Sequence, residues 1–222
     1  MMRPHHLALS LVLLASTACD NKPAEGKPKA AVEEVTQAPA QPAAPAAATT
    51  PEGKLASYNF SQENSKVEFT GAKVTGKHLG SFKKFSGTIR AQEGGTDASA
   101  GSVNVEIEVG SIEADVEKLT GHLKSPDLLD AEKYPKATFN STKVEKKEGS
   151  NYSITGSFQL HGATKLITFP ATIRLAPEQV EVDAEFAINR KDFGITYPGK
   201  PDDLISDDVL IKLTIRAPKT PT

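Results

Sequence analysis

Residues 121–139 (GHLKSPDLLDAEKYPKATF) concentrate side chains that can do acid–base or metal chemistry. These side chains are His122, Asp127, Asp130, Glu132 and Tyr134. A carboxylate beside an imidazole can orient it as a general acid or base. More often, such a short His–Asp set caps a helix end or ties down a loop. We therefore expect His122 and Asp127 to hold a surface element in place rather than to catalyse a reaction.

Other catalytic and metal signatures are weak. Beyond the first residues, histidine occurs only at His78, His122 and His161, without an H-x-x-x-H pair, so a zinc site would need three separate elements. No G-x-S-x-G, P-loop or dinucleotide-binding motif is present. The acidic segment 199–209 lacks the spacing of a calcium loop and is interpreted as a solvated turn. We predict no metal, no cofactor and no enzymatic activity.

The composition narrows the class of protein. The chain has 222 residues, of which 24% are charged and 38% hydrophobic, with a formal net charge of −2. This balance does not favour a nucleic acid or an anionic membrane surface as partner. One folded domain is expected.

The N-terminus predicts export. Residues 1–18 contain Arg3, two histidines and a short apolar run, which is typical of a signal peptide and too short to span a bilayer. Cys19 follows directly, and LLASTACD resembles a bacterial lipobox, in which this Cys is lipidated. Ser16 stands where Leu is usual, so cleavage by an ordinary signal peptidase is the alternative. We predict a lipoprotein of the bacterial periplasm or cell envelope, anchored in the membrane through Cys19.

Residues 19–53 are rich in Ala and Pro and almost lack large apolar side chains. Such a segment buries too little apolar surface to offset its ordering entropy. We predict a disordered tether over this range, followed by a folded domain at 54–218.

Period-two alternation dominates the folded domain. In SVNVEIEVGSI, for example, Val103, Val105 and Ile107 face one way and the intervening polar residues face the other. A single helix is expected over 113–124, stopped by Pro126. The expected strands cover 55–60, 65–71, 79–91, 102–112, 136–146, 151–161, 165–175, 178–190 and 207–217.

Alternating strands of this kind indicate an antiparallel sheet with one dry face, in a sandwich or a barrel. Gly156, Ala171 and Ala184 lie on the apolar faces among large residues. Small inward residues are compatible with a barrel that holds a ligand and equally with a tapered, packed interior. The residues alone leave both choices open.

Four motifs in order resemble the YceI-like family of bacterial periplasmic lipid-binding proteins, over essentially the whole folded domain. Leu128 and Leu129 stand where that family commonly has two phenylalanines. The motifs are HLGSFKKFSGTI (78–89), GHLKSPDLLDAEKYPKATFNSTKV (121–144), YSITGSFQLHGATKLITFPATI (152–173) and INRKDFGI (188–195).

The resemblance implies an all-β fold: an extended, eight-stranded, antiparallel lipocalin-like β-barrel with one short helix near its mouth. It also implies an apolar channel for a polyisoprenoid chain, either quinone-like or polyprenyl. Residues 121–139 would then form the lid and mouth of the channel, stabilised by His122 and Asp127. The predicted ligand-binding residues are Phe82, Phe85, Ile107, Leu119, Leu123, Leu128, Leu129, Phe139, Ile154, Phe158, Phe169, Phe186 and Phe193.

The expected partner is thus an isoprenoid or other long-chain lipid. A ligand-free envelope interaction module and an isoprenoid- or quinone-modifying enzyme are the alternatives. The oligomeric state stays open, with a homodimer as one option.

Overall fold

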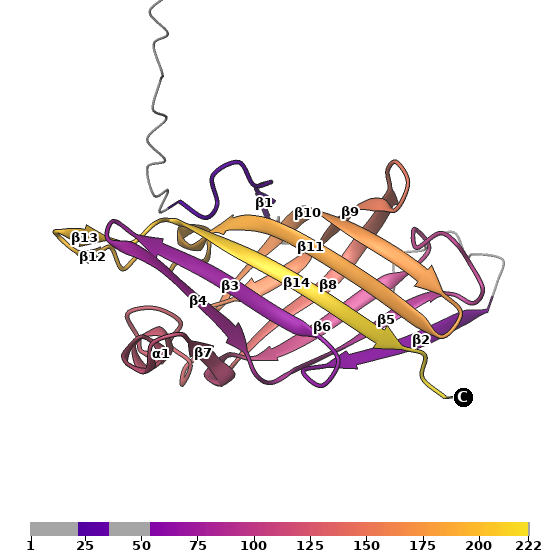
Figure 1. Ribbon diagram of the computed structural model, residues 1–222, viewed down its shortest axis with the longest axis horizontal. Coiled ribbons are helices and arrows are strands. Elements are labelled where there is room, and N and C mark those ends of the chain that lie inside the picture. Colours follow the sequence, from indigo (N-terminus) through magenta and orange to yellow (C-terminus); the bar gives the residue numbers. More distant parts are fainter. Residues whose placement is uncertain (1–21, 36–53, 222) are drawn as a thin grey trace, which may run out of the picture.

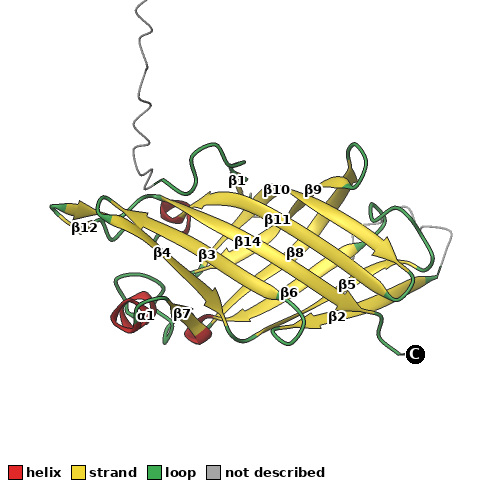
Figure 2. Cartoon of the chain, viewed as in Figure 1, coloured by secondary structure: helices red, strands yellow, loops and turns green. Residues whose placement is uncertain are grey.

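The computed structural model describes residues 22–35 and 54–221, so the predicted signal peptide and Cys19 lie outside the described residues. Within these ranges, one long antiparallel sheet curls around an apolar core, and the helix lies at one end of it (Figures 1 and 2). No helix in the described part of the chain is both long and apolar enough to cross a membrane.

The main path of the sheet contains eleven strands, and β1 (Ala31–Glu34) pairs with β10 as a twelfth. In order of pairing, the strands are β2 (Leu55–Ser61), β5 (Phe85–Gln92), β6 (Ser102–Glu108), β8 (Lys136–Lys146), β9 (Asn151–Leu160), β10 (Ala163–Ala176), β11 (Gln179–Asn189), β14 (Asp208–Pro218), β3 (Lys66–Lys73), β4 (Gly76–Phe82) and β7 (Ile112–Ala114). The short strands β12 (Gly199–Lys200) and β13 (Asp203–Leu204) pair separately. The helical elements are η1 (Val109–Ser111), α1 (Glu117–Lys124) and η2 (Arg190–Phe193).

The two distant parts of the sheet meet at the end of β14. Tyr58 forms a bridge to Lys219, and the Thr220 N–H donates to the Ser57 carbonyl over 2.8 Å. The predicted all-β, lipocalin-like barrel is therefore confirmed, although the sheet has more strands than the eight expected. One reason is that the expected strand 79–91 is two strands, β4 and β5, which pair with different partners.

Alternating burial follows the alternating sequence. In β11, every second residue from Val180 to Ile188 is buried, whereas Glu181, Asp183 and Glu185 are partly exposed. The apolar face of the curled sheet thereby encloses the core.

Helix α1 begins later than expected. Ala114 pairs with Gly80 and Glu113 with Ser81, so this part of the predicted helix is strand β7. The helix starts at Glu117 and ends at Lys124, two residues before Pro126, as expected. Local sequence missed the start because β7 is stabilised by pairing with β4, a strand far away in the sequence.

The predicted disordered tether is wrong for residues 31–34, which form β1 and pair with Lys165–Thr168 of β10. Just before β1, the Ala30 N–H donates to the Ala187 carbonyl over 2.9 Å, and the Ala187 N–H donates to the Pro28 carbonyl over 2.8 Å. This segment thus lies between β10 and β11, where it satisfies backbone groups of both strands. Composition missed it because backbone pairing needs no large apolar side chains. Residues 36–53 lie outside the described residues.

Candidate functional site

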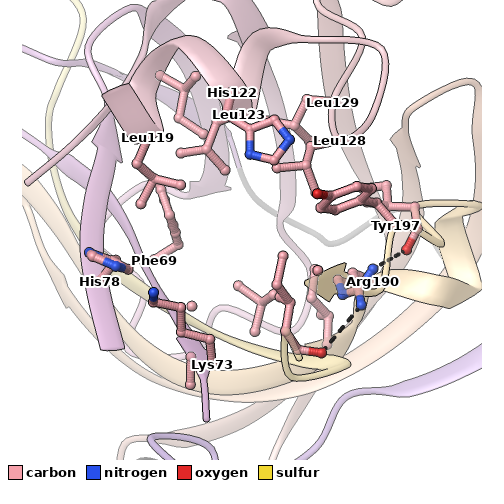
Figure 3. Close-up of a pocket in the computed structure, with 18 of the residues that line it drawn as sticks. Phe69, Lys73, His78, Leu119, His122, Leu123, Leu128, Leu129, Arg190 and Tyr197 are labelled. Atoms are coloured by element: carbon pink, nitrogen blue, oxygen red, sulfur yellow. Dashed lines mark hydrogen bonds between the residues drawn. The ribbon is translucent and has the colours of Figure 1, made fainter. Parts of the chain in front are cut away.

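A cavity of about 600 Å³ lies between α1 and the adjacent end of the barrel (Figure 3). Its walls are mainly apolar and come from α1, from the loop that follows it and from several strands. The lid consists of α1 and this loop, residues 117–135. Figure 3 shows Leu119 and Leu123 of the helix and Leu128 and Leu129 of the loop on the same side of the cavity.

Backbone hydrogen bonds fold the loop back onto the end of the helix. The Leu129 N–H donates to the Leu123 carbonyl over 3.1 Å, and the Asp130 N–H donates to the Ser125 carbonyl over 2.9 Å. Asp130 has a φ of 45°, the left-handed conformation that reverses the chain here. Leu128 and Leu129 are only 7% and 9% exposed as a result. The turn therefore places two leucines over the cavity.

His122 has two partners near the mouth. Its Nε2 lies 3.2 Å from Oδ2 of Asp127, so the pair expected from the sequence is in contact. Its ring also meets the ring of Tyr197 edge to face. Because the Asp127 side chain is largely exposed, its contact with His122 contributes little to stability. Tyr197, which the sequence did not indicate, lines the cavity from the segment between η2 and β12.

Two carboxylates with lowered pKa values lie on or next to the cavity wall: Asp203 lines the cavity, and Asp115 contacts His78, which lines it. The Lys73 ammonium, 2.5 Å from Asp203, and then Thr75 lower the pKa of Asp203 by hydrogen bonding. Burial raises the pKa of Asp115, but hydrogen bonds from the Leu79 N–H and from His78 lower it by more. An apolar cavity with charged groups at its rim can hold an apolar chain with a polar end.

Arg190 is the buried charge beside the cavity. Its Nη1 donates to the Ile195 carbonyl over 2.6 Å, its Nε to the Ser206 carbonyl over 3.0 Å, and its Nη2 reaches Asp207 over 3.3 Å. Burial lowers the pKa of the guanidinium, and the Asp207 carboxylate opposes this effect. Arg190 thus joins the loops on either side of β12 and β13 at the cavity wall. Its place in the motif INRKDFGI was the only signal for it in the sequence.

A model of the YceI-like domain matches residues 58–217. The chain belongs to the YceI-like family.

Curated relatives include the proteins named YceI from Salmonella arizonae and Salmonella newport. Each is 38% identical to this YceI-like chain over 123 residues, which is 53% of this chain. The matched region spans 63% of the length of these relatives, slightly less than two thirds.

Solved structures of similar fold include proteins of three bacteria. BcnA of Burkholderia cenocepacia is 27% identical, with a TM-score of 0.65 over 71% of this chain and 99% of BcnA. The YCEI protein of Campylobacter jejuni is 26% identical, with a TM-score of 0.55 over 64% of this chain and 85% of that protein. A polyisoprenoid binding domain from Saccharophagus degradans is 17% identical, with a TM-score of 0.59 over 75% of this chain and all of that domain. This last likeness shows the fold alone.

The structure of the YceI-like chain brings seven of the thirteen predicted ligand-binding residues to the cavity and leaves six elsewhere. The seven on the cavity wall are Phe82, Ile107, Leu119, Leu123, Leu128, Leu129 and Phe158. The six that do not line it are Phe85, Phe139, Ile154, Phe169, Phe186 and Phe193. These six pack in the core or against it, and Phe193, for example, meets Phe158 at 5.2 Å between ring centroids. Their inward orientation is readable from the alternation, but their distance from the lid is not.

The small residues that the sequence pattern suggested as cavity-lining lie elsewhere in the structure. Gly156, Ala171 and Ala184 do not line it. A Cβ on Gly156 would lie 2.4 Å from Cζ of Phe139, so the glycine makes room for an aromatic ring. The interior around Gly156 is therefore packed, which is one of the two alternatives that the sequence allowed. Small residues on the cavity wall include Gly71, Ala72 and Ala137.

Within residues 22–35 and 54–221, no three His, Cys, Asp or Glu side chains gather closely enough to hold a metal ion. His78 contacts Asp115, His122 contacts Asp127, and His161 contacts the Phe193 carbonyl through Nδ1 at 3.1 Å. The three histidines therefore have separate partners on separate elements.

Proposed function

We propose that this YceI-like chain binds an isoprenoid lipid, quinone-like or polyprenyl, with the chain of the lipid in the cavity under the lid. The observation that carries the proposal is the apolar cavity itself, covered by Leu119, Leu123, Leu128 and Leu129 and bounded by apolar residues of the barrel. Without an occupant, this surface would be apolar and in contact with water. A lipid chain removes it from water.

The binding energy would come from apolar burial. Each buried CH₂ group gains about 0.8 kcal/mol, so a short isoprenoid chain binds firmly without any polar contact. The head group would remain at the rim, near the Lys73–Asp203 and His78–Asp115 pairs. Selectivity would then follow from cavity shape and from these rim groups.

One solved structure of the same fold is named for the same class of ligand. The domain from Saccharophagus degradans is described as polyisoprenoid binding, and this chain shares its fold. The proposal for this chain rests on the cavity, because the sequence identity of 17% between the two is low.

We propose binding without catalysis. His78 and His122 are each engaged with a carboxylate at the rim, and Arg190 donates to backbone carbonyls. These contacts give each polar group a structural role. A bound lipid that is recovered chemically unchanged after incubation with the protein would support this view, and a modified product would contradict it.

We also propose that the protein acts in the bacterial periplasm, anchored through a lipid on Cys19 after removal of residues 1–18. Intact mass spectrometry of the mature protein tests this proposal directly. We expect an N-terminal Cys19 with a diacylglyceryl-sized mass increase that is absent from Cys19→Ser. A mature chain without that mass would overturn the anchor and leave the lipid-binding proposal untouched.

Mass spectrometry of organic extracts tests lipid binding. The full chain is purified from its native host without a lipid-like detergent, and a mock purification from cells lacking the gene serves as control. We expect an isoprenoid in near-stoichiometric amount in the protein sample alone. Repeated absence of any isoprenoid would contradict the proposal.

A further inference from the structure

We infer that Phe139, Phe169 and Phe186 form a floor that ends the cavity and limits how much of an isoprenoid chain the cavity can bury. The inference rests on the proposed function and adds a specificity to it. We call these three side chains the aromatic floor.

The three rings form a continuous row across the barrel interior. The centroids of Phe139 and Phe169 are 5.6 Å apart, and those of Phe169 and Phe186 are 4.2 Å apart with nearly parallel planes. The rings come from β8, β10 and β11, so the row spans strands that are separated in the sequence. Phe169 and Phe186 are buried, at 5% and 4% exposed, and Phe139 is partly buried against the same core.

Cross-strand pairs place this row directly next to the cavity. Phe158 lines the cavity and is paired with Phe139 of the floor. Ile211 also lines the cavity and is paired with Phe186 of the floor. Directly paired residues are the nearest neighbours on one face of a sheet. On two sides, therefore, the floor begins where the cavity wall ends.

The floor is held in position by its neighbours. The ring of Phe139 occupies the space that a Cβ on Gly156 would take, at 2.4 Å, so the glycine on β9 forms a seat for the ring. Beside the row, Ile154 is paired with Phe169 and is itself buried. Close-packed side chains of this kind yield space only when they are removed.

A chain that is longer than the cavity must leave its far end outside the mouth, because the floor closes the way into the rest of the barrel. Every CH₂ left outside gains no burial energy. The ligand that fits is therefore a short isoprenoid chain, or a long lipid of which only one end is held.

A competition between two isoprenoid alcohols tests this inference. Geranylgeraniol, which is short, and solanesol, which is much longer, are mixed with the full chain, and native mass spectrometry reads the ratio of the two complexes. The wild type should bind the two alcohols about equally, because the part of solanesol that stays outside the mouth adds no burial energy. The double variant Phe169→Leu with Phe186→Leu should shift the ratio toward solanesol at least about tenfold, since additional chain becomes buried.

Phe60→Leu is the matched control. Phe60 is also a buried ring seated on a glycine, Gly87, but it does not line the cavity or belong to the floor. The ratio of the two isoprenoid complexes measured for Phe60→Leu should stay at the wild-type value. If the double variant does not fold by circular dichroism, Phe186→Leu alone should produce a smaller shift in the same direction.

The outcomes separate the inference from the function on which it rests. If the wild type binds geranylgeraniol and the folded floor variants keep the wild-type ratio, the floor does not set chain length. A wild type that prefers solanesol overturns the inference as well. If the wild type binds neither alcohol nor any extracted isoprenoid, the proposed function itself is wrong, and the inference falls with it.

Discussion

The imidazole of His122 meets the ring of Tyr197 edge to face, with centroids 5.1 Å apart and planes at 87°. His122 belongs to α1 of the lid, whereas Tyr197 lies between η2 and β12. Both residues line the cavity (Figure 3). The contact therefore connects the lid with the segment between η2 and β12. If the cavity binds a lipid as proposed, this contact should slow its release.

Tyr197→Ala removes this contact and should speed ligand release. Aromatic pairs contribute about 0.5–1.5 kcal/mol beyond their buried area, so the dissociation rate of a bound isoprenoid should rise about twofold to tenfold. Stopped-flow dilution of a fluorescent isoprenoid complex measures this rate. Tyr197→Phe keeps the ring and should behave like the wild type. Equal rates for Tyr197→Ala and Tyr197→Phe would show that the contact does not hold the lid.

Leu128→Glu combined with Leu129→Glu should expel the ligand from a domain that remains folded. Two carboxylates in the apolar cavity wall would have to be desolvated when a lipid binds, which is costly. Lipid extraction and mass spectrometry measure the occupancy. Leu55→Glu with Leu204→Glu changes two exposed leucines outside the cavity wall and should keep wild-type occupancy. Unchanged occupancy in the lid variant would contradict the site.

Arg190→Ala should lower the free energy of unfolding by about 2–4 kcal/mol, because buried carbonyl groups of Ile195 and Ser206 lose their donor. Urea denaturation measures the change. Arg174→Ala is the control, since the Arg174 side chain is 57% exposed and pairs only at the surface. Arg174→Ala should lower the free energy of unfolding by less than about 1 kcal/mol. Similar losses for both variants would argue against a structural role for Arg190.

The Lys73–Asp203 pair should make the stability depend on pH at the acid end. The pKa of Asp203 in the folded protein lies below its ordinary value of 3.8, chiefly because of the hydrogen bond from Lys73. The stability that ionised Asp203 contributes to the folded protein is therefore complete at pH values above its ordinary pKa. This stability is lost as the pH falls through the pKa of Asp203 in the folded protein.

Urea midpoints of the wild type and Asp203→Asn, measured over a pH series, test this dependence. The difference between the two should be constant above about pH 5 and should shrink at lower pH. The neighbouring Asp202→Asn serves as control and should leave the wild-type profile unchanged. A difference that is independent of pH down to the acid transition would contradict the prediction.

Ala30→Pro should release the segment before β2 from the barrel wall. Proline has no N–H, so the Ala187 carbonyl loses the donor that now lies 2.9 Å away. Hydrogen exchange should become faster at Ala187 and along residues 165–168, which pair with β1. Val35→Pro, one residue beyond β1, is the control and should leave exchange unchanged. Slow exchange at Ala187 in both variants would show that the pairing is not needed for protection.

Much of this protein follows from local sequence. Alternation from Val180 to Ile188 predicted a strand with one buried face, and that strand is β11. Pro126 predicted the end of the helix to within two residues. Leu119, Leu123, Leu128 and Leu129 were predicted as a group because they lie close together in the sequence, and the lid brings them to one cavity. Such features depend on neighbours a few residues away, so the sequence displays them directly.

Other features depend on partners that are distant in the sequence. Phe158 and Phe169 carry the same inward pattern, yet one lines the cavity and the other belongs to the aromatic floor. Only the pairing of β8, β9, β10 and β11, together with the curl of the sheet, fixes how far each side chain lies from the lid.

The sequence by itself therefore determined the all-β class, most of the strands, the end of the helix and the family, because alternation, Pro126 and ordered motifs act locally. The tertiary structure alone decided that Phe139 fills the space above Gly156, that β1 pairs with β10, and where the cavity ends. The physical reason is that the period-two alternation along a strand shows on which face of the sheet a side chain lies. Its depth in the barrel is set by strand register and by close packing against residues from other strands.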